Sequence, residues 1–170
     1  MLDTRMQDAI NKQINAEYYS AFLYLSMSAR FNALGLAGGA NWMNIQFQEE
    51  LAHAMKFVGY VSERGGTVAL ATIEGPPRDW KSALAMFEHA LEHEQKVTGL
   101  INALADLALE IKDHATHNLL QWFIAEQVEE EASADTMVQK LRLTKDAPGG
   151  IFQLDSEMAT RVFTPPAPTN

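Results

Sequence analysis

A set of three polar residues that occurs twice, with one spacing, constrains the fold of this chain more than any other feature of the sequence. The first set is Glu17, Glu50 and His53, and the second, 77 residues further on in every case, is Glu94, Gln127 and Glu130. Each set consists of a single Glu followed by a polar pair three residues apart, which lies on one face of an α-helix. These polar residues interrupt the apolar stripes that a helix buries. The repeat therefore predicts two similar helical hairpins, each with polar groups in its core.

The expected helix lengths bring the two sets to similar heights in the fold. From Glu17 a helix would continue to about residue 34, and a second would return from about residue 37 to Glu50. At about 1.5 Å per residue, these two arms are roughly 25 and 20 Å long. The second hairpin repeats this geometry from Glu94 to Gln127. Both hairpins are therefore expected to present their acids near the middle of a bundle.

Apolar residues recur every three to four positions in five segments of the chain, which predicts five helices. The expected ranges are about 4–34, 37–64, 82–112, 115–143 and 151–163. Asp3 and Ser82 are candidate N-caps, because their side chains can accept a hydrogen bond from the first helical turn. The tail 164–170, with the sequence TPPAPTN, is expected to be disordered.

The segment between the second and third helices is long and contains Pro76 and Pro77. At about 3.3 Å per residue its 17 residues can span roughly 50 Å, so it can pass along the whole length of a helix. The second and third helices would then be parallel. We therefore predict an all-α fold, a four-helix bundle with one long crossover connection and a short fifth C-terminal helix. With 47% hydrophobic residues, the chain has enough core for a single domain spanning 1–170.

Composition limits both the chemistry and the partners of this chain. A net charge of −9 argues against nucleic-acid binding and favours cations as partners. The absence of Cys removes thiolate ligands and disulfides, and it fits a reducing compartment. No apolar run approaches the roughly 18 residues that a membrane span needs, and the first residues do not form a signal peptide. We therefore expect a soluble, cytoplasmic protein without membrane association.

Four acids of the repeated sets, Glu17, Glu50, Glu94 and Glu130, would carry four negative charges into the core. Burying ionised carboxylates together is unfavourable unless positive charge compensates them, and two divalent cations would do so. Oxygen ligands with one imidazole and no thiolate suit iron or manganese, although zinc could also bind. Our hypothesis is that each subunit binds two Fe(II) ions, which reduce O2 or H2O2.

Several segments of the sequence also resemble those of a known family. They are Glu17, Tyr24, Gln48–His53, His93–Gln95, Leu120–Trp122 and Glu126–Glu130. Through them the chain resembles the bacterial non-haem ferritins, of the ferritin-like di-iron family, over essentially all 170 residues. Ferritin-like di-iron bundles often carry two Glu-x-x-His motifs, whereas this chain has one, at Glu50 and His53.

The resemblance implies a set of iron ligands. One iron would bind Glu17, Glu50 and His53, and a second would bind Glu50, Glu94 and Glu130, with Gln127 nearby. A third iron site would use Glu49, Glu126 and Glu129 and would share Glu130. The resemblance also implies that Tyr24 donates an electron during oxidation. No haem is expected, because Leu51 stands where bacterioferritins carry their haem-ligating Met.

The function implied by the resemblance is iron storage with ferroxidase activity. Fe(II) would be oxidised at the paired site and stored as ferric mineral inside a hollow homo-oligomeric shell of 24 subunits. One alternative is a di-iron oxygenase or peroxide-scavenging enzyme, which would need an open substrate cavity and usually has two Glu-x-x-His motifs. Another alternative is a helical assembly protein whose acids bind no metal.

Overall fold

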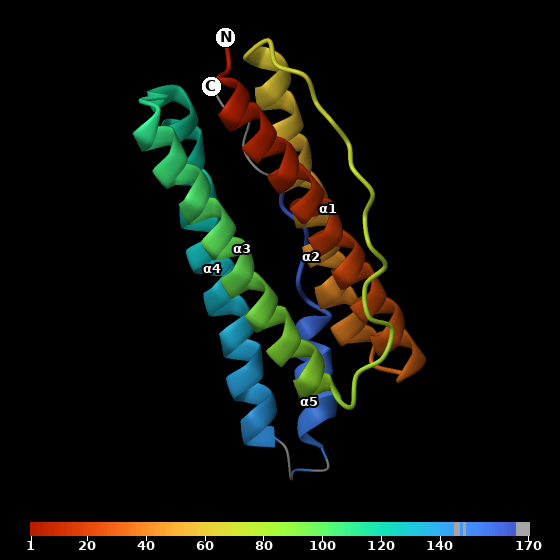
Figure 1. The fold of residues 1–170 in the computed structure, drawn as a ribbon. Coiled ribbons are helices and arrows are strands. Elements are labelled where there is room, and N and C mark those ends of the chain that lie inside the picture. Colours follow the sequence, from red (N-terminus) through yellow and green to blue (C-terminus); the bar gives the residue numbers. More distant parts are fainter. Residues whose placement is uncertain (145–146, 148, 166–170) are drawn as a thin grey trace.

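The computed structural model describes residues 1–144, 147 and 149–165, and within them it contains five α-helices. The helices are α1 (Thr4–Ala33), α2 (Ala37–Glu63), α3 (Ala83–Glu110), α4 (His114–Thr144) and α5 (Gly150–Met158), as Figure 1 shows. The first four form a bundle and the fifth is short, which confirms the predicted fold class. Among the described residues, no helix has the length and apolar character needed to cross a bilayer.

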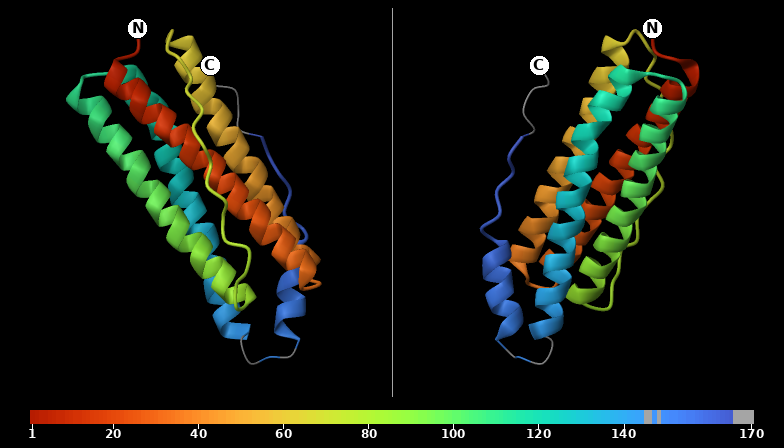
Figure 2. Two further views of the ribbon diagram at one scale, coloured as in Figure 1. Left: turned by 45° about the vertical axis from the view of Figure 1, so that its right-hand side comes forward. Right: turned by 90° about the vertical axis from the view of Figure 1, so that its left-hand side faces the viewer.

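The bundle consists of two helical hairpins, α1 with α2 and α3 with α4, joined where α1 packs against α3. The connection between α2 and α3 runs along the length of the bundle, so α2 and α3 are parallel, as predicted (Figures 1 and 2). Polar side chains of α1 hold this connection in place. The Asn11 amide donates to the Thr67 carbonyl and accepts from the Ala69 N–H, both at 3.0 Å.

The helix ends follow from local chemistry. The Asp3 carboxylate accepts from the Arg5 N–H at 2.8 Å, and the Ser82 hydroxyl accepts from the Ala85 N–H at 3.1 Å, so both predicted N-caps are confirmed. Gly35 follows α1 with a φ of +74°, a left-handed conformation that glycine adopts without steric cost. Lys112 adopts a φ of 59° after α3, which therefore ends at Glu110, two residues earlier than predicted.

The prediction of a fifth helix over 151–163 was wrong at its C-terminal end, because α5 ends at Met158. The Asn41 side chain donates to the carbonyls of Met158 at 3.2 Å and Arg161 at 3.0 Å. These carbonyls are thereby satisfied by α2, so the segment leaves the helix and lies along α2. Residues 164 and 165 have no regular secondary structure, and the rest of the tail predicted to be disordered lies outside the described residues.

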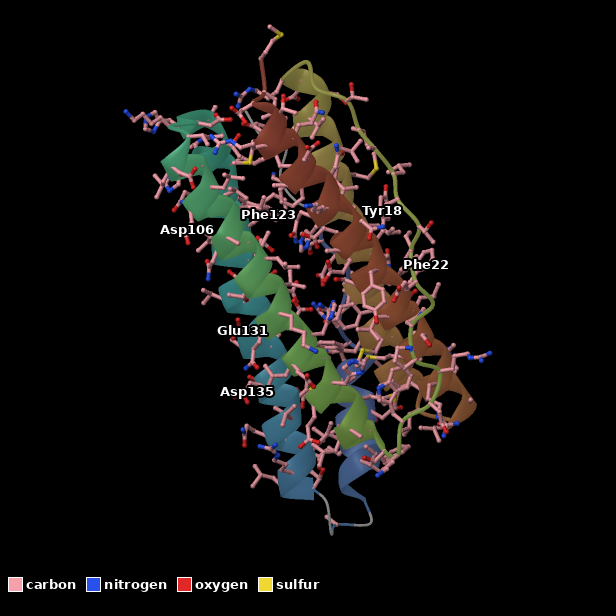
Figure 3. All side chains as sticks on the ribbon, viewed as in Figure 1. Tyr18, Phe22, Asp106, Phe123, Glu131 and Asp135 are labelled. Carbon is pink, nitrogen blue, oxygen red and sulfur yellow. The ribbon has the colours of Figure 1, made fainter. Side chains whose placement is uncertain are left out.

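A polar layer divides the core of the bundle into two apolar clusters. One cluster surrounds Phe31 and Phe87 near α5, and the other surrounds Phe57 and Phe123 towards the opposite end, where Figure 3 places Phe123 between the hairpins. The buried polar residues include all six residues of the repeated sets, each 7% exposed or less: Glu17, Glu50, His53, Glu94, Gln127 and Glu130. The predicted placement of these residues in the core is therefore confirmed.

Candidate metal centre

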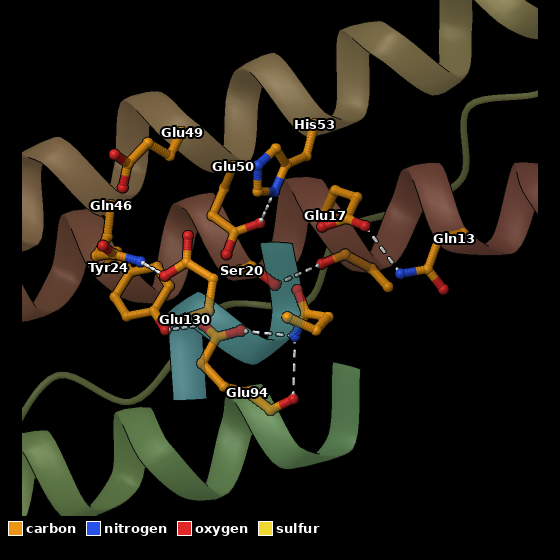
Figure 4. A network of polar contacts seen from close by, with 12 residues as sticks. Gln13, Glu17, Ser20, Tyr24, Gln46, Glu49, Glu50, His53, Glu94 and Glu130 are labelled. Atoms are coloured by element: carbon orange, nitrogen blue, oxygen red, sulfur yellow. Dashed lines mark hydrogen bonds and ion pairs between the residues drawn. The ribbon is translucent and has the colours of Figure 1, made fainter. Parts of the chain in front are cut away.

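The polar layer brings carboxylates from all four long helices together (Figure 4). Glu17 of α1 lies with Glu50 and His53 of α2, and one ligand atom from each lies within 4.8 Å of the others. The His53 Nδ1 atom is 3.5 Å from Glu50 Oε2. Two carboxylates and one imidazole at this separation can bind a single cation jointly.

Glu94 of α3 is held through both of its carboxylate oxygens. The Tyr24 hydroxyl of α1 donates to Glu94 Oε1. The Gln127 side-chain amide donates to Glu94 Oε2 at 3.1 Å and to the Glu94 carbonyl at 3.2 Å. These donors fix the orientation of Glu94 and link α1, α3 and α4 at the height of the centre.

Two glutamines that the sequence reasoning gave no role also belong to the centre. The Gln46 amide donates to Glu130 Oε2 at 2.6 Å, and the Gln13 amide donates to Glu17 Oε1 at 2.9 Å. Each glutamine lies four residues before a ligand candidate on its own helix, Gln46 before Glu50 and Gln13 before Glu17. This spacing places them on the same helix face, and it was a signal available in the sequence.

Two acids of the centre, Glu50 and Glu94, have raised pKa values in the absence of a cation. Burial raises the pKa of Glu94 from 4.5 to about 8, and the neighbouring charge of Glu130 adds to this effect. Burial also raises the pKa of Glu50 well above its usual value, with further contributions from Glu94 and Glu17. Burial raises the pKa of Tyr24 as well, so its hydroxyl remains a hydrogen-bond donor.

Some of the buried acceptor atoms in the centre have no donor. Among the described residues, Glu17 Oε2, Glu50 Oε2 and Gln46 Oε1 are buried without a hydrogen-bond partner. Such atoms are rare in folded proteins, because an unpaired buried polar group is costly. Three oxygen acceptors without donors, next to one imidazole, match the ligands that a divalent iron ion prefers. The residues present therefore fit a metal centre.

The structure does not bring together all of the residues predicted to bind a third iron. Glu126 lies with His53 and Glu130, and one ligand atom of each is within 4.8 Å of the others. Glu129 is exposed. Glu49 forms an ion pair at 2.7 Å with Arg161, which the sequence reasoning missed. The two residues are 112 positions apart, so no local pattern of the sequence could indicate this contact.

Comparison with known proteins places this geometry in a family. The family description "Ferritin-like domain" matches residues 7–144. The chain is 45% identical to a bacterial non-heme ferritin of Bacteroides fragilis, covering 95% of this chain and 100% of the relative. It is 34% identical to a bacterial non-heme ferritin of Staphylococcus aureus, covering 96% and 98%.

The solved structures that match this chain are also ferritins. The structure of an open pore ferritin from the archaeon Archaeoglobus fulgidus matches with a TM-score of 0.94 and 52% identity, over 95% of this chain and 100% of that chain. An engineered closed form of the same ferritin matches with a TM-score of 0.95 and 53% identity, over 96% of this chain and 100% of that chain. Together with the buried carboxylates and His53, these matches show that the chain belongs to the ferritin family of iron-storage proteins with ferroxidase activity.

Proposed function

We propose that each chain binds two Fe(II) ions as substrate in the polar layer, oxidises them to Fe(III), and passes the product to a mineral core inside a cage of 24 cytoplasmic subunits. The observation that supports this proposal best is the group of buried oxygen acceptors that lack donors in the described structure, Glu17 Oε2, Glu50 Oε2 and Gln46 Oε1. In this proposal residues 1–170 form one domain, which holds a complete centre.

The proposed ligands are those that the resemblance to ferritins implies, and the structure supports the first set best. One Fe(II) would bind Glu17, Glu50 and His53, which lie within 4.8 Å of one another. The second would bind Glu50, Glu94 and Glu130, with Gln127 nearby. Glu50 is common to both sets, and its buried Oε2 has no hydrogen-bond partner among the described residues. A third Fe(II) would bind Glu49, Glu126, Glu129 and Glu130. No haem is proposed, because Leu51 follows Glu50 in place of a haem-ligating Met.

The oxidation balances with either of two oxidants. Two Fe(II) ions supply two electrons, which with two protons convert O2 to H2O2, or convert H2O2 to two molecules of water. As the cations bind, Glu50 and Glu94 release any proton that their raised pKa values retain. The Tyr24 hydroxyl remains protonated and donates to Glu94, where it can orient that carboxylate.

Iron loading of the purified assembly tests this function. Under air, we expect uptake of many more than three Fe(II) per chain in a particle far larger than the 18.9 kDa chain. A monomer or dimer that takes up only two irons per chain would instead support the di-iron oxygenase or peroxide-scavenging alternative. A particle that takes up no iron would support the metal-free assembly protein. Absorbance of the ferric product and the mass of the particle together separate the three outcomes.

A further inference from the structure

The segment that follows α5 lies on α2, next to the acids of the proposed centre. The Asn41 amide donates to the carbonyls of Met158 and Arg161, at 3.2 and 3.0 Å. The Gly39 N–H donates to Asp155 Oδ1 at 2.8 Å. These contacts fix α5 and the segment after it on α2, the helix that carries Glu49 and Glu50. The backbone of Arg161 is therefore held in place next to that helix.

The Arg161 guanidinium is held on two sides. It lies over the Trp42 ring, with its central carbon 4.5 Å from the ring centroid, a favourable cation–π geometry. Its Nη2 atom donates to Glu49 Oε2 at 2.7 Å, and the Arg161 and Glu49 side chains are only 25% and 21% exposed. The Nη1 atom is buried and has no hydrogen-bond partner among the described residues.

Among the described residues, Glu49 pairs with Arg161 and is not in the group of close ligand atoms to which two of the other acids expected at a third iron, Glu126 and Glu130, belong. Glu126 instead lies with His53 and Glu130, and Glu129 is exposed. Burial raises the pKa of Glu49 to about 7, the charge of Arg161 lowers it, and the charges of Glu130 and Glu126 raise it. The positive group that this structure places beside Glu49 is the Arg161 guanidinium, at 2.7 Å.

We propose that Arg161 is a tethered cation that occupies the Glu49 side of the third iron position and so weakens the binding of a third ion. This inference rests on the proposed function. For Fe(II) to bind Glu49, it must displace a charge-assisted hydrogen bond and a guanidinium stacked on Trp42. Charge-assisted hydrogen bonds are about twice as strong as neutral ones, so removing the guanidinium should tighten the third ion by about tenfold or more.

Anaerobic calorimetric titration of the assembled full-length protein with Fe(II) tests this inference. In the unmodified protein we expect two tightly bound ions per chain and a weak third. Arg161→Ala should tighten the third ion by about tenfold or more and leave the first two unchanged, since it does not contact their ligands. Arg161→Lys, which keeps the positive charge, should leave the third ion weak. Arg142→Ala is the matched control, because Arg142 forms an exposed ion pair with Glu88 at 2.9 Å.

A second substitution shows whether the effect passes through Glu49. In a Glu49→Gln background, Arg161→Ala should no longer tighten the third ion, and anomalous diffraction from crystals soaked in Fe(II) should show an added ion at Glu49 only in Arg161→Ala. A third ion that binds equally or more weakly in Arg161→Ala would overturn the inference while leaving two tight ions intact. If Arg161→Ala does not assemble, Arg161→Gln replaces it in the same titration. The absence of any tight ion in the unmodified protein would instead refute the proposed function.

Discussion

Among single residues, Glu50 has the least favourable environment for a carboxylate in the metal centre. It lies with Glu17 and His53, one of its oxygens has no donor among the described residues, and burial among other acids opposes its ionisation. A residue in this position is maintained at a cost to folding, which is typical of a functional group. Its removal is therefore expected to affect iron chemistry more than it affects stability.

We predict that Glu50→Ala abolishes the fast phase of Fe(II) oxidation, because both proposed iron positions lose a ligand. The initial rate, followed by stopped-flow absorbance of the ferric product, should fall by more than the roughly 10- to 100-fold typical of losing a hydrogen-bond partner outside the ligand set. Glu92→Ala is the control, because Glu92 forms an exposed pair with Lys96 and should leave the rate unchanged. An unchanged initial rate in Glu50→Ala would exclude a bridging role.

The metal-free protein should lose stability as the pH rises. The folded-state pKa of Glu94 is raised from 4.5 to about 8, and that of Glu50 is raised too. Between pH 4.5 and 8 the folded chain therefore retains protons that the unfolded chain has released, so the free energy of unfolding falls with increasing pH. Because one pKa unit corresponds to about 1.4 kcal/mol, we expect a fall of a few kcal/mol over this range.

The matching variant is Glu94→Gln, whose neutral amide does not titrate. We expect it to be more stable than the unmodified protein at pH 8 without metal, and to show a flatter dependence of stability on pH. Thermal unfolding of chelator-treated protein at one fixed concentration measures both effects. Added divalent cation should stabilise the unmodified protein more than the variant. An identical pH dependence in the two proteins would show that Glu94 does not titrate in this range.

At the scale of helices, local sequence signals predicted most helix boundaries, and tertiary contacts determined the others. Asp3 and Ser82 start their helices as expected, because capping depends only on neighbouring residues. The fifth helix ends at Met158, whose carbonyl accepts from the Asn41 side chain of α2, a contact between residues far apart in the sequence. The repeat indicated which acids would be buried, but the pairing of Glu49 with Arg161 depends on how α5 docks, which periodicity does not encode.

The docking of α5 on α2 depends on Gly38. A Cβ atom at Gly38 would lie 1.6 Å from the Asp155 carbonyl oxygen, a backbone atom that cannot move without displacing α5. We predict that Gly38→Ala destabilises the protein by roughly 1–3 kcal/mol and increases hydrogen exchange in α5. Thermal unfolding and exchange of backbone amides measure the two effects.

Gly59 provides the control on the same helix, since a Cβ atom there would meet nothing within 4 Å. Gly59→Ala should stabilise α2 by up to about 1 kcal/mol, because alanine favours the helical conformation more than glycine does. If both alanine variants shifted the unfolding temperature in the same direction, close packing at Gly38 would not explain the docking of α5.

At the scale of the whole molecule, an apolar groove on α1, α2 and the crossover connection is consistent with an assembly surface. The groove has a volume of about 330 Å³ and is lined by Tyr18, Phe22, Leu51, Leu70 and other residues. Figure 3 shows Tyr18 and Phe22 on this side of the subunit, and Phe22 is 42% exposed. Contiguous apolar surface of this kind is commonly covered by a partner, and here the expected partner is another copy of the chain.

We therefore predict that Phe22→Glu shifts the assembly from the oligomeric cage towards smaller species, because a carboxylate would be buried without a partner between two copies. Size-exclusion chromatography with light scattering measures the shift, and circular dichroism checks that each subunit remains helical. Phe22→Tyr keeps the aromatic ring and should assemble normally. A Phe22→Glu protein that still forms the full cage would place this groove outside the subunit contacts.

The division of the ligands between two hairpins has a consequence for biosynthesis. The α1–α2 hairpin carries Glu17, Glu50 and His53, while the α3–α4 hairpin carries Glu94 and Glu130. A newly made chain in which only one hairpin has formed therefore has only part of the proposed ligand set. Under the proposed function, tight binding of two irons would require both hairpins to have docked, so iron binding would distinguish fully folded subunits from incompletely folded ones.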